Sequence, residues 1–354
     1  FSITNCYATS ISYGIWKTRG AKDLQSYLKG NNDAKWWGIG ISIMATQASA
    51  ITFLSTPGQA YTDGMRFIQF YFGLPIAMII LSVTFLPIFY RLKVYTAYEY
   101  LETRFDLKTR TLAAFLFLIQ RGLAAGITIY APSIILSTLL NWNLTLTNIF
   151  IGLLVIIYTV SGGTKAVTQT QKQQMAVMMG GMILAGILVL NMLPSNISFL
   201  DAVNVAGKMG KLNLVNFDFS LDDRYNFWTG TTAALFLFLS YFGTDQSQVQ
   251  RYLTGKSLAQ SRLGLIMNGL LKIPMQLIIL FIGVMVFVFY QFNTPPIFFN
   301  KVELNNVKSS IYSEQVIKLE NEFKVLHEKK TVDIYSLLYA QKHEDKLKIE
   351  ELKT

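Results

Sequence analysis

The stretch Trp36–Leu54 is apolar and long enough to cross a membrane, but residues 44–50 in its middle read MATQASA, which is small and polar. Non-helical backbone at membrane depth persists only where it is buried in protein or lines a cavity. We therefore expect the helix to break there and to offer the Ala45 and Ala48 carbonyl oxygens to a hard cation such as sodium. The alternative is an unbroken helix that packs closely through its small residues.

Polar side chains accompany this break, and a second break is expected further along the chain. Gln47 and Thr52 would line the same cavity as the freed carbonyls. A later apolar segment ends in residues 240–246, which read SYFGTDQ and include Tyr241. Two interrupted spans about 195 residues apart are the pattern expected of an inverted-repeat transporter.

Two cationic side chains are expected deep in the bilayer. Arg121 lies eleven residues past Arg110, and Lys272 lies ten past Arg262, which places them roughly 16 and 15 Å along their helices. Intramembrane charges are costly and face the bundle interior or water, so each is a functional candidate that could hold an anionic substrate. The alternative is that each caps the freed carbonyls of a broken helix. The nearest carboxylate is Asp245, at a helix end.

Composition indicates an integral membrane protein. Hydrophobic residues make up 52% of the chain and charged residues only 15%, a balance rare in a soluble domain of this length. The single cysteine, Cys6, allows no intramolecular disulfide, and both histidines lie in the polar tail, which argues against an enzyme. The net charge of +10 includes no Lys/Arg-rich run, so a nucleic-acid partner is not expected.

The apolar segments predict one partial and seven full membrane spans. They cover residues 1–16 (partial), 36–54, 67–90, 112–140, 146–160, 175–193, 228–243 and 263–290. Alternate connections hold fifteen Lys or Arg against four on the other side, so the richer set is predicted to be cytoplasmic. Residues 161–164 are expected to form a tight cytoplasmic turn, residues 95–106 a short surface helix, and residues 313–327 a helix in the tail.

Several longer motifs carry a resemblance to a known family. They are PGQAY at 57–61, FYRL at 89–92, TAYEYLETRF at 96–105, IYAPSIIL at 129–136, GGTKAV at 162–167 and QSQVQRYL at 246–253. Through them the chain resembles the sodium/solute symporter family over residues 7–292, most closely its iodide and multivitamin branch.

The resemblance implies an all-α integral membrane protein with a LeuT-type inverted-repeat fold whose second repeat is incomplete. Residues 36–193 would form the first five-helix repeat and 228–290 the first two helices of the second. Residues 1–16 would be a partial first span and 291–354 a polar, extramembrane helical insertion. The sequence is accordingly expected to be a fragment truncated at both ends.

The resemblance also implies symport driven by the sodium gradient. Ala45 and Ala48 would supply half of a sodium site, with the other half on a later span. Thr52 stands where several carriers place a substrate-touching Gln, and Lys272 matches a lysine near the substrate of a sugar carrier. Gln171 replaces an Asp that follows the Gly-Gly turn in the family, which leaves sodium release by that route in question.

Departures from the family pattern point away from sugar. Tyr71 replaces a sugar-binding Glu, and Phe238 replaces a sugar-binding Asn. The substrate-binding candidates are Gln47, Thr52, Tyr71, Arg121, Phe238, Tyr241 and Lys272.

We expect a multi-pass protein of the plasma membrane, or of the inner membrane in a bacterium, that imports a small organic or inorganic anion, such as a monocarboxylate or vitamin acid, together with sodium by alternating access. Its expected partners are sodium, the solute and the lipid bilayer. The alternatives are a transport-inactive membrane sensor or structural protein with the same fold, and a carrier of a neutral sugar or polyol.

Overall fold

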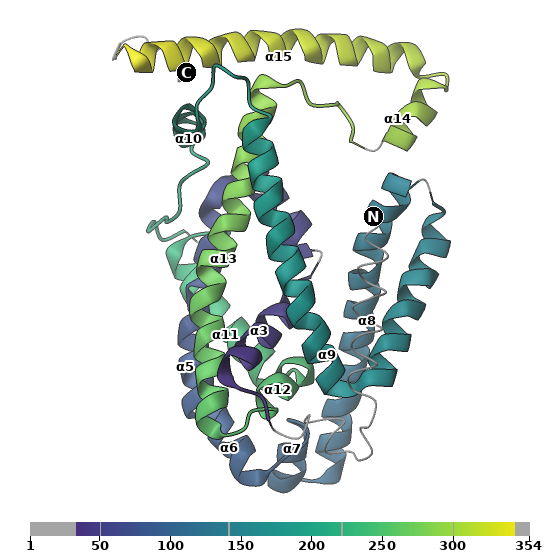
Figure 1. Ribbon diagram of the computed structural model, residues 1–354, viewed down its shortest axis with the longest axis vertical. Coiled ribbons are helices and arrows are strands. Elements are labelled where there is room, and N and C mark those ends of the chain that lie inside the picture. Colours follow the sequence, from purple (N-terminus) through teal and green to yellow (C-terminus); the bar gives the residue numbers. More distant parts are fainter. Residues whose placement is uncertain (1–32, 50, 141, 221, 300, 344–354) are drawn as a thin grey trace.

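The computed structural model describes residues 33–49, 51–140, 142–220, 222–299 and 301–343 of the chain, and these residues form an all-helical bundle (Figure 1). The predicted partial span at residues 1–16 lies outside the described residues. The elements are α3 (Trp36–Gln47), η2 (Ile51–Ser55), α4 (Thr56–Asp63), η3 (Gly64–Tyr71), α5 (Gly73–Val83), α6 (Phe85–Leu92), α7 (Glu99–Arg104), α8 (Leu107–Leu140), α9 (Leu144–Asn191), α10 (Phe199–Lys208), α11 (Phe227–Thr244), α12 (Gln246–Leu253), α13 (Leu258–Phe292), α14 (Lys301–Lys308) and α15 (Ser313–Lys342).

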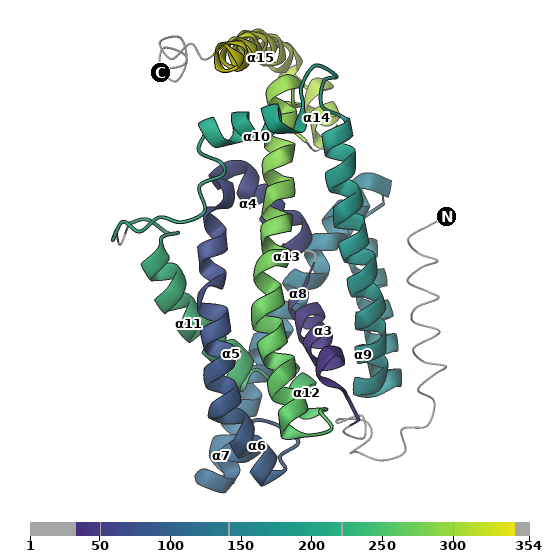
Figure 2. The ribbon, with the colours of Figure 1, turned by 60° about the vertical axis from the view of Figure 1, so that its left-hand side comes forward.

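Helix α13 is the central element of the bundle. It packs against α3, α4 and α5, which are far from it in sequence (Figure 2). The most apolar part of α13 is 56% buried, whereas that of α8 is 6% buried. The buried apolar side chains Ile39, Leu74 and Leu265 come from α3, α5 and α13 and belong to one core cluster. Within the described residues, other helices therefore cover little of α8.

The first predicted span breaks where its sequence becomes small and polar. Helix α3 ends at Gln47, and Ala48 takes an extended backbone conformation with φ −80° and ψ 107°. Helical turns resume at Ile51, but they continue through α4 to Asp63. The predicted end at Leu54 was therefore wrong, because Pro57 in the first turn of α4 is compatible with helix initiation and does not stop the segment.

The chain passes from α4 to η3 at Gly64, which has a φ of +77°. A Cβ at this position would lie 2.7 Å from the Lys211 carbonyl oxygen. The Met65 N–H donates to that same oxygen at 2.9 Å. Both the left-handed backbone and the close approach of the loop after α10 require glycine here.

Helix α9 differs from the prediction in the residues that join its two apolar arms. Residues 146–160 and 175–193 were expected to be two spans separated by a turn at 161–164, but the backbone is helical throughout Leu144–Asn191. Its two ends lie at the same end of the bundle, so the helical backbone changes direction between Leu144–Ile157 and Val167–Asn191 and passes the bundle twice (Figure 1). The two ends of α9 have different neighbours: Gly152 faces Ile129 of α8, and Gly186 faces Ile282 of α13.

A polar tail helix crosses one end of the bundle (Figure 1). The predicted helix at 313–327 is confirmed and runs further, to Lys342. His327 Nε2 lies 2.8 Å from Tyr290 O, and Thr331 Oγ1 donates to Gln291 O at 2.9 Å. Both acceptors lie in the last turn of α13, so α15 is attached to the end of the central helix.

Four helical stretches of the described residues are long and apolar enough to cross a membrane. They are Ile51–Leu92, Leu107–Leu140, Val167–Asn191 and Leu258–Phe292. Leu144–Ile157 is a shorter apolar helix. These lengths and compositions agree with a membrane protein.

Gly283 allows α13 to approach the start of α4. A Cβ at this position would lie 2.7 Å from Pro57 Cα and closer still to its carbonyl oxygen. We expect Gly283→Ala to destabilise the protein by about 1–3 kcal/mol, because well-packed backbone cannot absorb the methyl group. Thermal unfolding of the full-length protein in detergent will measure this change.

The matched control is Gly180→Ala in α9, where an added Cβ meets nothing within 4 Å. It should leave stability unchanged or raise it by up to about 1 kcal/mol, since alanine favours helix. Equal melting temperatures for the two variants would contradict the close packing of α13 on α4.

Candidate functional site

The break after α3 leaves backbone oxygens available for a ligand. The Ala48 N–H donates to Met44 O at 2.9 Å. The next donor, the Ser49 N–H, is 3.4 Å from Thr52 Oγ1 and not bonded to Ala45 O. Gln47 Oε1 is buried and has no hydrogen-bond partner among the described residues. Carbonyl and amide oxygens of this kind are suitable ligands for a hard cation such as sodium.

Gln171 of α9 fastens the last turn of α3. Ser42 Oγ donates to Gln171 Oε1 at 2.8 Å, and Gln171 Nε2 donates to Thr46 Oγ1 at 2.9 Å. Thr46 Oγ1 in turn donates to Ser42 O at 2.7 Å. An amide can accept one bond and donate the other, whereas an ionised carboxylate only accepts. The amide at position 171 therefore fits this bridge in a way that the Asp implied by the family resemblance would not.

The second predicted break also exists, between α11 and α12. Asp245 has an extended backbone with φ −75° and ψ 114°, and its Oδ1 accepts from the Ser247 N–H at 2.9 Å. Its Oδ2 lies 2.6 Å from Arg121 Nη2 of α8. The Arg121 guanidinium also bonds Ser247 Oγ and lies 5.9 Å from the centre of the Tyr241 ring.

Arg121 thus has a carboxylate partner within the protein, which the sequence suggested only as the nearest choice. The ion pair ties α8 to the break between α11 and α12. The contact that Arg121 makes in the structure is with Asp245, which holds the break between α11 and α12 in place. A role for Arg121 in holding a substrate stays a prediction.

The connection between α6 and α8 supports the same break. Tyr98 Oη donates to Thr244 O at 3.0 Å, and the Gln246 side chain bonds both Ala97 N and Tyr95 O. Burial, reinforced by the nearby Asp245 carboxylate, raises the pKa of Tyr98 to about 12. The phenol therefore remains protonated and able to donate near neutral pH. The short helix predicted within 95–106 is confirmed as α7.

A buried polar stripe on α13 surrounds the second deep cation. Asn268, Lys272 and Gln276 recur at four-residue intervals, which places them on one face of the helix. All three are buried. Lys272 Nζ, Asn268 Oδ1 and both polar atoms of the Gln276 amide have no hydrogen-bond partner among the described residues. Because an unpaired buried charge costs several kcal/mol, this stripe is the strongest candidate for a ligand site among the described residues.

Sequence reasoning identified Lys272 but missed Asn268 and Gln276. The signal was available, because two amides four residues on either side of a lysine are unusual in an apolar span. It was overlooked because each amide alone resembles an ordinary helix residue.

The other substrate candidates fall into separate groups. Tyr71 and Phe238 are buried and their ring centres are 6.1 Å apart. Thr52 Oγ1 belongs to the α3 break, and Tyr241 Oη accepts from Gln248 Nε2 at 2.8 Å beside the second break. The structure therefore brings Tyr71 together with Phe238 and Arg121 together with Tyr241. No hydrogen bond or ion pair among the described residues joins Lys272 to these side chains.

The ion pair between Arg121 and Asp245 can be tested by a double-mutant cycle. We expect Arg121→Gln and Asp245→Asn each to destabilise the protein, because each leaves an opposite charge without its partner. The double variant should lose less than the sum, with a coupling energy of about 1–3 kcal/mol. Unfolding of the full-length protein in nanodiscs measures all three, with the exposed Arg91→Gln as control. Additive losses would contradict direct pairing.

Known proteins with similar sequences are sodium-coupled transporters. Residues 27–319 match the profile of the sodium:solute symporter family. The chain is 34% identical to sodium-coupled monocarboxylate transporter 1 of Xenopus laevis over 259 residues, which is 70% of this chain and 40% of that protein. It is 30% identical to the human sodium/iodide cotransporter over 295 residues, 82% of this chain and 45% of that protein.

A solved structure shares the fold. It is a Na⁺-coupled sialic acid symporter in a substrate-bound, outward-open state, with a TM-score of 0.76 and 26% sequence identity. The alignment covers 96% of this chain and 72% of the other. The predicted LeuT-type fold and the resemblance to iodide carriers are therefore confirmed, and the chain spans less than half the length of these two curated relatives. The chain belongs to the sodium:solute symporter family.

Proposed function

We propose that the whole protein carries a small anion into the cell together with sodium, by alternating access. The observation that carries this proposal is the buried Lys272 ammonium, which has no hydrogen-bond partner among the described residues and lies between the amides of Asn268 and Gln276. An anion would neutralise that charge, and its oxygen atoms would accept hydrogen bonds from the ammonium and the amides. The relatives named for monocarboxylate and iodide carry anions, which supports the same class of substrate.

Sodium is proposed to bind at the break after α3. The Ala45 and Ala48 carbonyls and Gln47 Oε1 would form part of its ligand shell. Met275 and Ile279 of α13 belong to the same buried cluster as Ala45, so the break touches the helix that carries Lys272. Sodium that orders this break would prepare the α13 face for the anion, which is positive coupling between the two ligands.

The proposed setting is the plasma membrane, with the apolar helices in the lipid bilayer. Residues 36–193 and 228–290 would belong to the two inverted repeats, and residues 291–354 would lie outside the membrane. A membrane sensor with the same fold is the competing reading, and it predicts tight anion binding without sodium-dependent uptake. A sugar carrier is disfavoured by the aromatic pair at Tyr71 and Phe238.

Replacing Lys272 tests the anion proposal. In cells that express the full-length protein, we expect Lys272→Gln to lower kcat/KM for sodium-dependent propionate uptake by roughly 10- to 100-fold, the size of a lost charged hydrogen bond. Lys272→Arg should keep part of the activity. The control is Lys108→Gln, an equal charge change at an exposed position. Uptake that ignores sodium, or neutral sugars that compete better than propionate, would refute the proposal.

The bridge made by Gln171 tests the sodium proposal. Gln171→Leu removes both bonds to α3, each worth about 1 kcal/mol, so we expect the sodium concentration for half-maximal uptake to rise about 3- to 30-fold. Gln171→Glu, which keeps an acceptor for Ser42, should have an intermediate effect. Gln174→Leu on the same helix serves as the control.

A purely structural role for Gln171 predicts another result. Expression and maximal uptake would fall in Gln171→Leu while sodium half-saturation stayed at the wild-type value, and that outcome would contradict a connection between this bridge and the ion site.

A further inference from the structure

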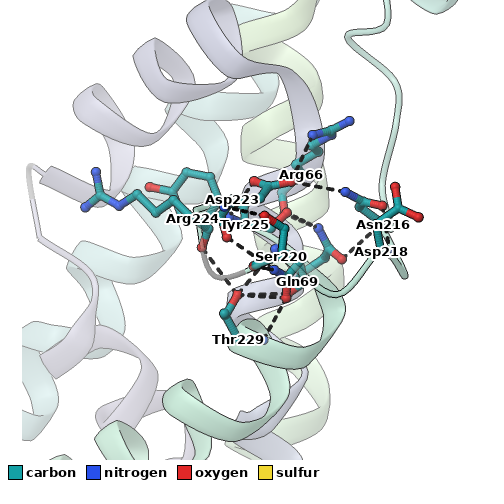
Figure 3. A network of polar contacts seen from close by, with 10 residues as sticks. Arg66, Gln69, Asn216, Asp218, Ser220, Asp223, Arg224, Tyr225 and Thr229 are labelled. Carbon is teal, nitrogen blue, oxygen red and sulfur yellow. Dashed lines mark hydrogen bonds and ion pairs between the residues drawn. The ribbon is translucent and has the colours of Figure 1, made fainter.

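A polar pocket of about 490 Å³ lies away from both breaks, on the side predicted to be extracellular. It is formed where α4 meets η3, by the loop after α10 and by the segment before α11. Figure 3 shows the network of polar contacts in its wall. Its volume is within the range of small-molecule binding sites. None of the residues assigned to the two breaks or to the polar stripe on α13 lines it.

The charged side chains that line this pocket differ in whether they already form an ion pair. Three are cationic, Arg66, Lys211 and Arg224, and two are anionic, Asp63 and Asp223. The balance of formal charge in the pocket is therefore positive.

Both oxygen atoms of the Asp223 carboxylate already have partners in the wall of the pocket. Its Oδ2 lies 3.4 Å from Arg66 Nη1 and accepts from Asn216 Nδ2 at 3.0 Å. Its Oδ1 accepts from the Tyr225 N–H at 3.1 Å. Gln69 fixes the same loop, because its amide bonds Tyr225 O and Asn216 N (Figure 3). Specific hydrogen bonds and an ion pair therefore hold the wall of the pocket in place.

Two cations of the pocket, Arg224 and Lys211, form no ion pair within 4 Å with a described carboxylate. Arg224 is exposed, has no ion pair with the described carboxylates, and its guanidinium lies 5.4 Å from the centre of the Tyr225 ring. Lys211 Nζ donates to Thr62 O and lies 4.5 Å from the centre of the Phe287 ring. Burial lowers the pKa of Lys211, although the nearby Asp63 carboxylate opposes this shift. A bound anion would favour the charged form of Lys211 further.

An aromatic series connects the pocket with the interior. Tyr225 packs against Phe67 at 5.3 Å, Phe67 against Tyr71 at 5.8 Å, and Tyr71 against Phe238 at 6.1 Å, all between ring centres. The wall of the pocket therefore adjoins the aromatic pair that the sequence placed near the substrate.

We propose that this pocket, named here the outer pocket, is a separate binding site for a small organic anion of the monocarboxylate class, with Arg224 and Lys211 as its cationic ligands. It captures the anion from the extracellular solution and so raises the anion concentration next to the proposed interior site at Lys272. A net positive field at a cleft increases the association rate of anions in this way, and salt weakens the effect. The choice of a carboxylate rests on the proposed function, whereas the existence of the outer pocket as an anion site does not.

The test uses the full-length protein and propionate as the probe. We expect Arg224→Gln to raise the KM for sodium-dependent propionate uptake about 3- to 10-fold at low ionic strength, with unchanged maximal uptake and a smaller shift at high salt. Arg224→Lys should recover most of the affinity, because it keeps the charge. The matched control is Lys329→Gln, which removes one exposed positive charge from α15 on the same side but outside the pocket. An equal effect of both Gln variants, or no effect of Arg224→Gln, would overturn the proposal.

Equilibrium binding separates this proposal from the transport function. Propionate binding is measured by saturation-transfer NMR on Lys272→Gln in nanodiscs, with and without Arg224→Gln. Binding that survives in Lys272→Gln and weakens at least threefold in the double variant supports the outer pocket, even if the wild type shows no sodium-dependent uptake and the proposed function fails. Binding that is absent from Lys272→Gln, or unchanged in the double variant, refutes the outer pocket.

Discussion

A polypeptide inside a membrane must satisfy its own backbone hydrogen bonds, and this constraint governs the structure at Ala48 and Asp245. Each break frees backbone groups that water would otherwise solvate, so each needs support from another helix. The first break is held by Gln171 of α9 through Ser42 and Thr46. The second is held by Arg121 of α8 through Asp245. Both supports come from outside the broken helices, which makes α8 and α9 part of the site although neither is buried.

The two deep cations illustrate how similar sequence signals can have different physical roles. Arg121 has a carboxylate at 2.6 Å, so its charge is matched and its effect is to position a backbone break. Lys272 is surrounded by protein, and its ammonium has no hydrogen-bond partner in the described part of the chain. Only the second arrangement leaves a free-energy cost that a ligand would offset. For this reason the proposed anion site is centred on α13 and the proposed sodium site on the neighbouring end of α3.

Local composition was sufficient to predict the helical fold and both breaks, because small and polar residues in an apolar span mark the interruption directly. It failed where long-range contacts decide the outcome. The bridge from Gln171 to Ser42 joins residues 129 positions apart, and the pairing of Arg121 with Asp245 could only be guessed from depth. The change of direction between the two arms of α9 is made with helical backbone through residues 161–164, and not with the tight turn inferred from Ser and Gly. Asn268 and Gln276 were missed because their importance depends on the lysine between them.

The central claim is that sodium at the α3 break and an anion at Lys272 stabilise one another. The most direct measurement is the dissociation constant for propionate on the purified full-length protein across a range of sodium concentrations, with choline as the replacement ion. The account predicts that sodium tightens propionate binding and that this dependence disappears in Lys272→Gln, since coupling between two ligands requires both sites. An affinity for propionate that is the same with and without sodium would contradict it.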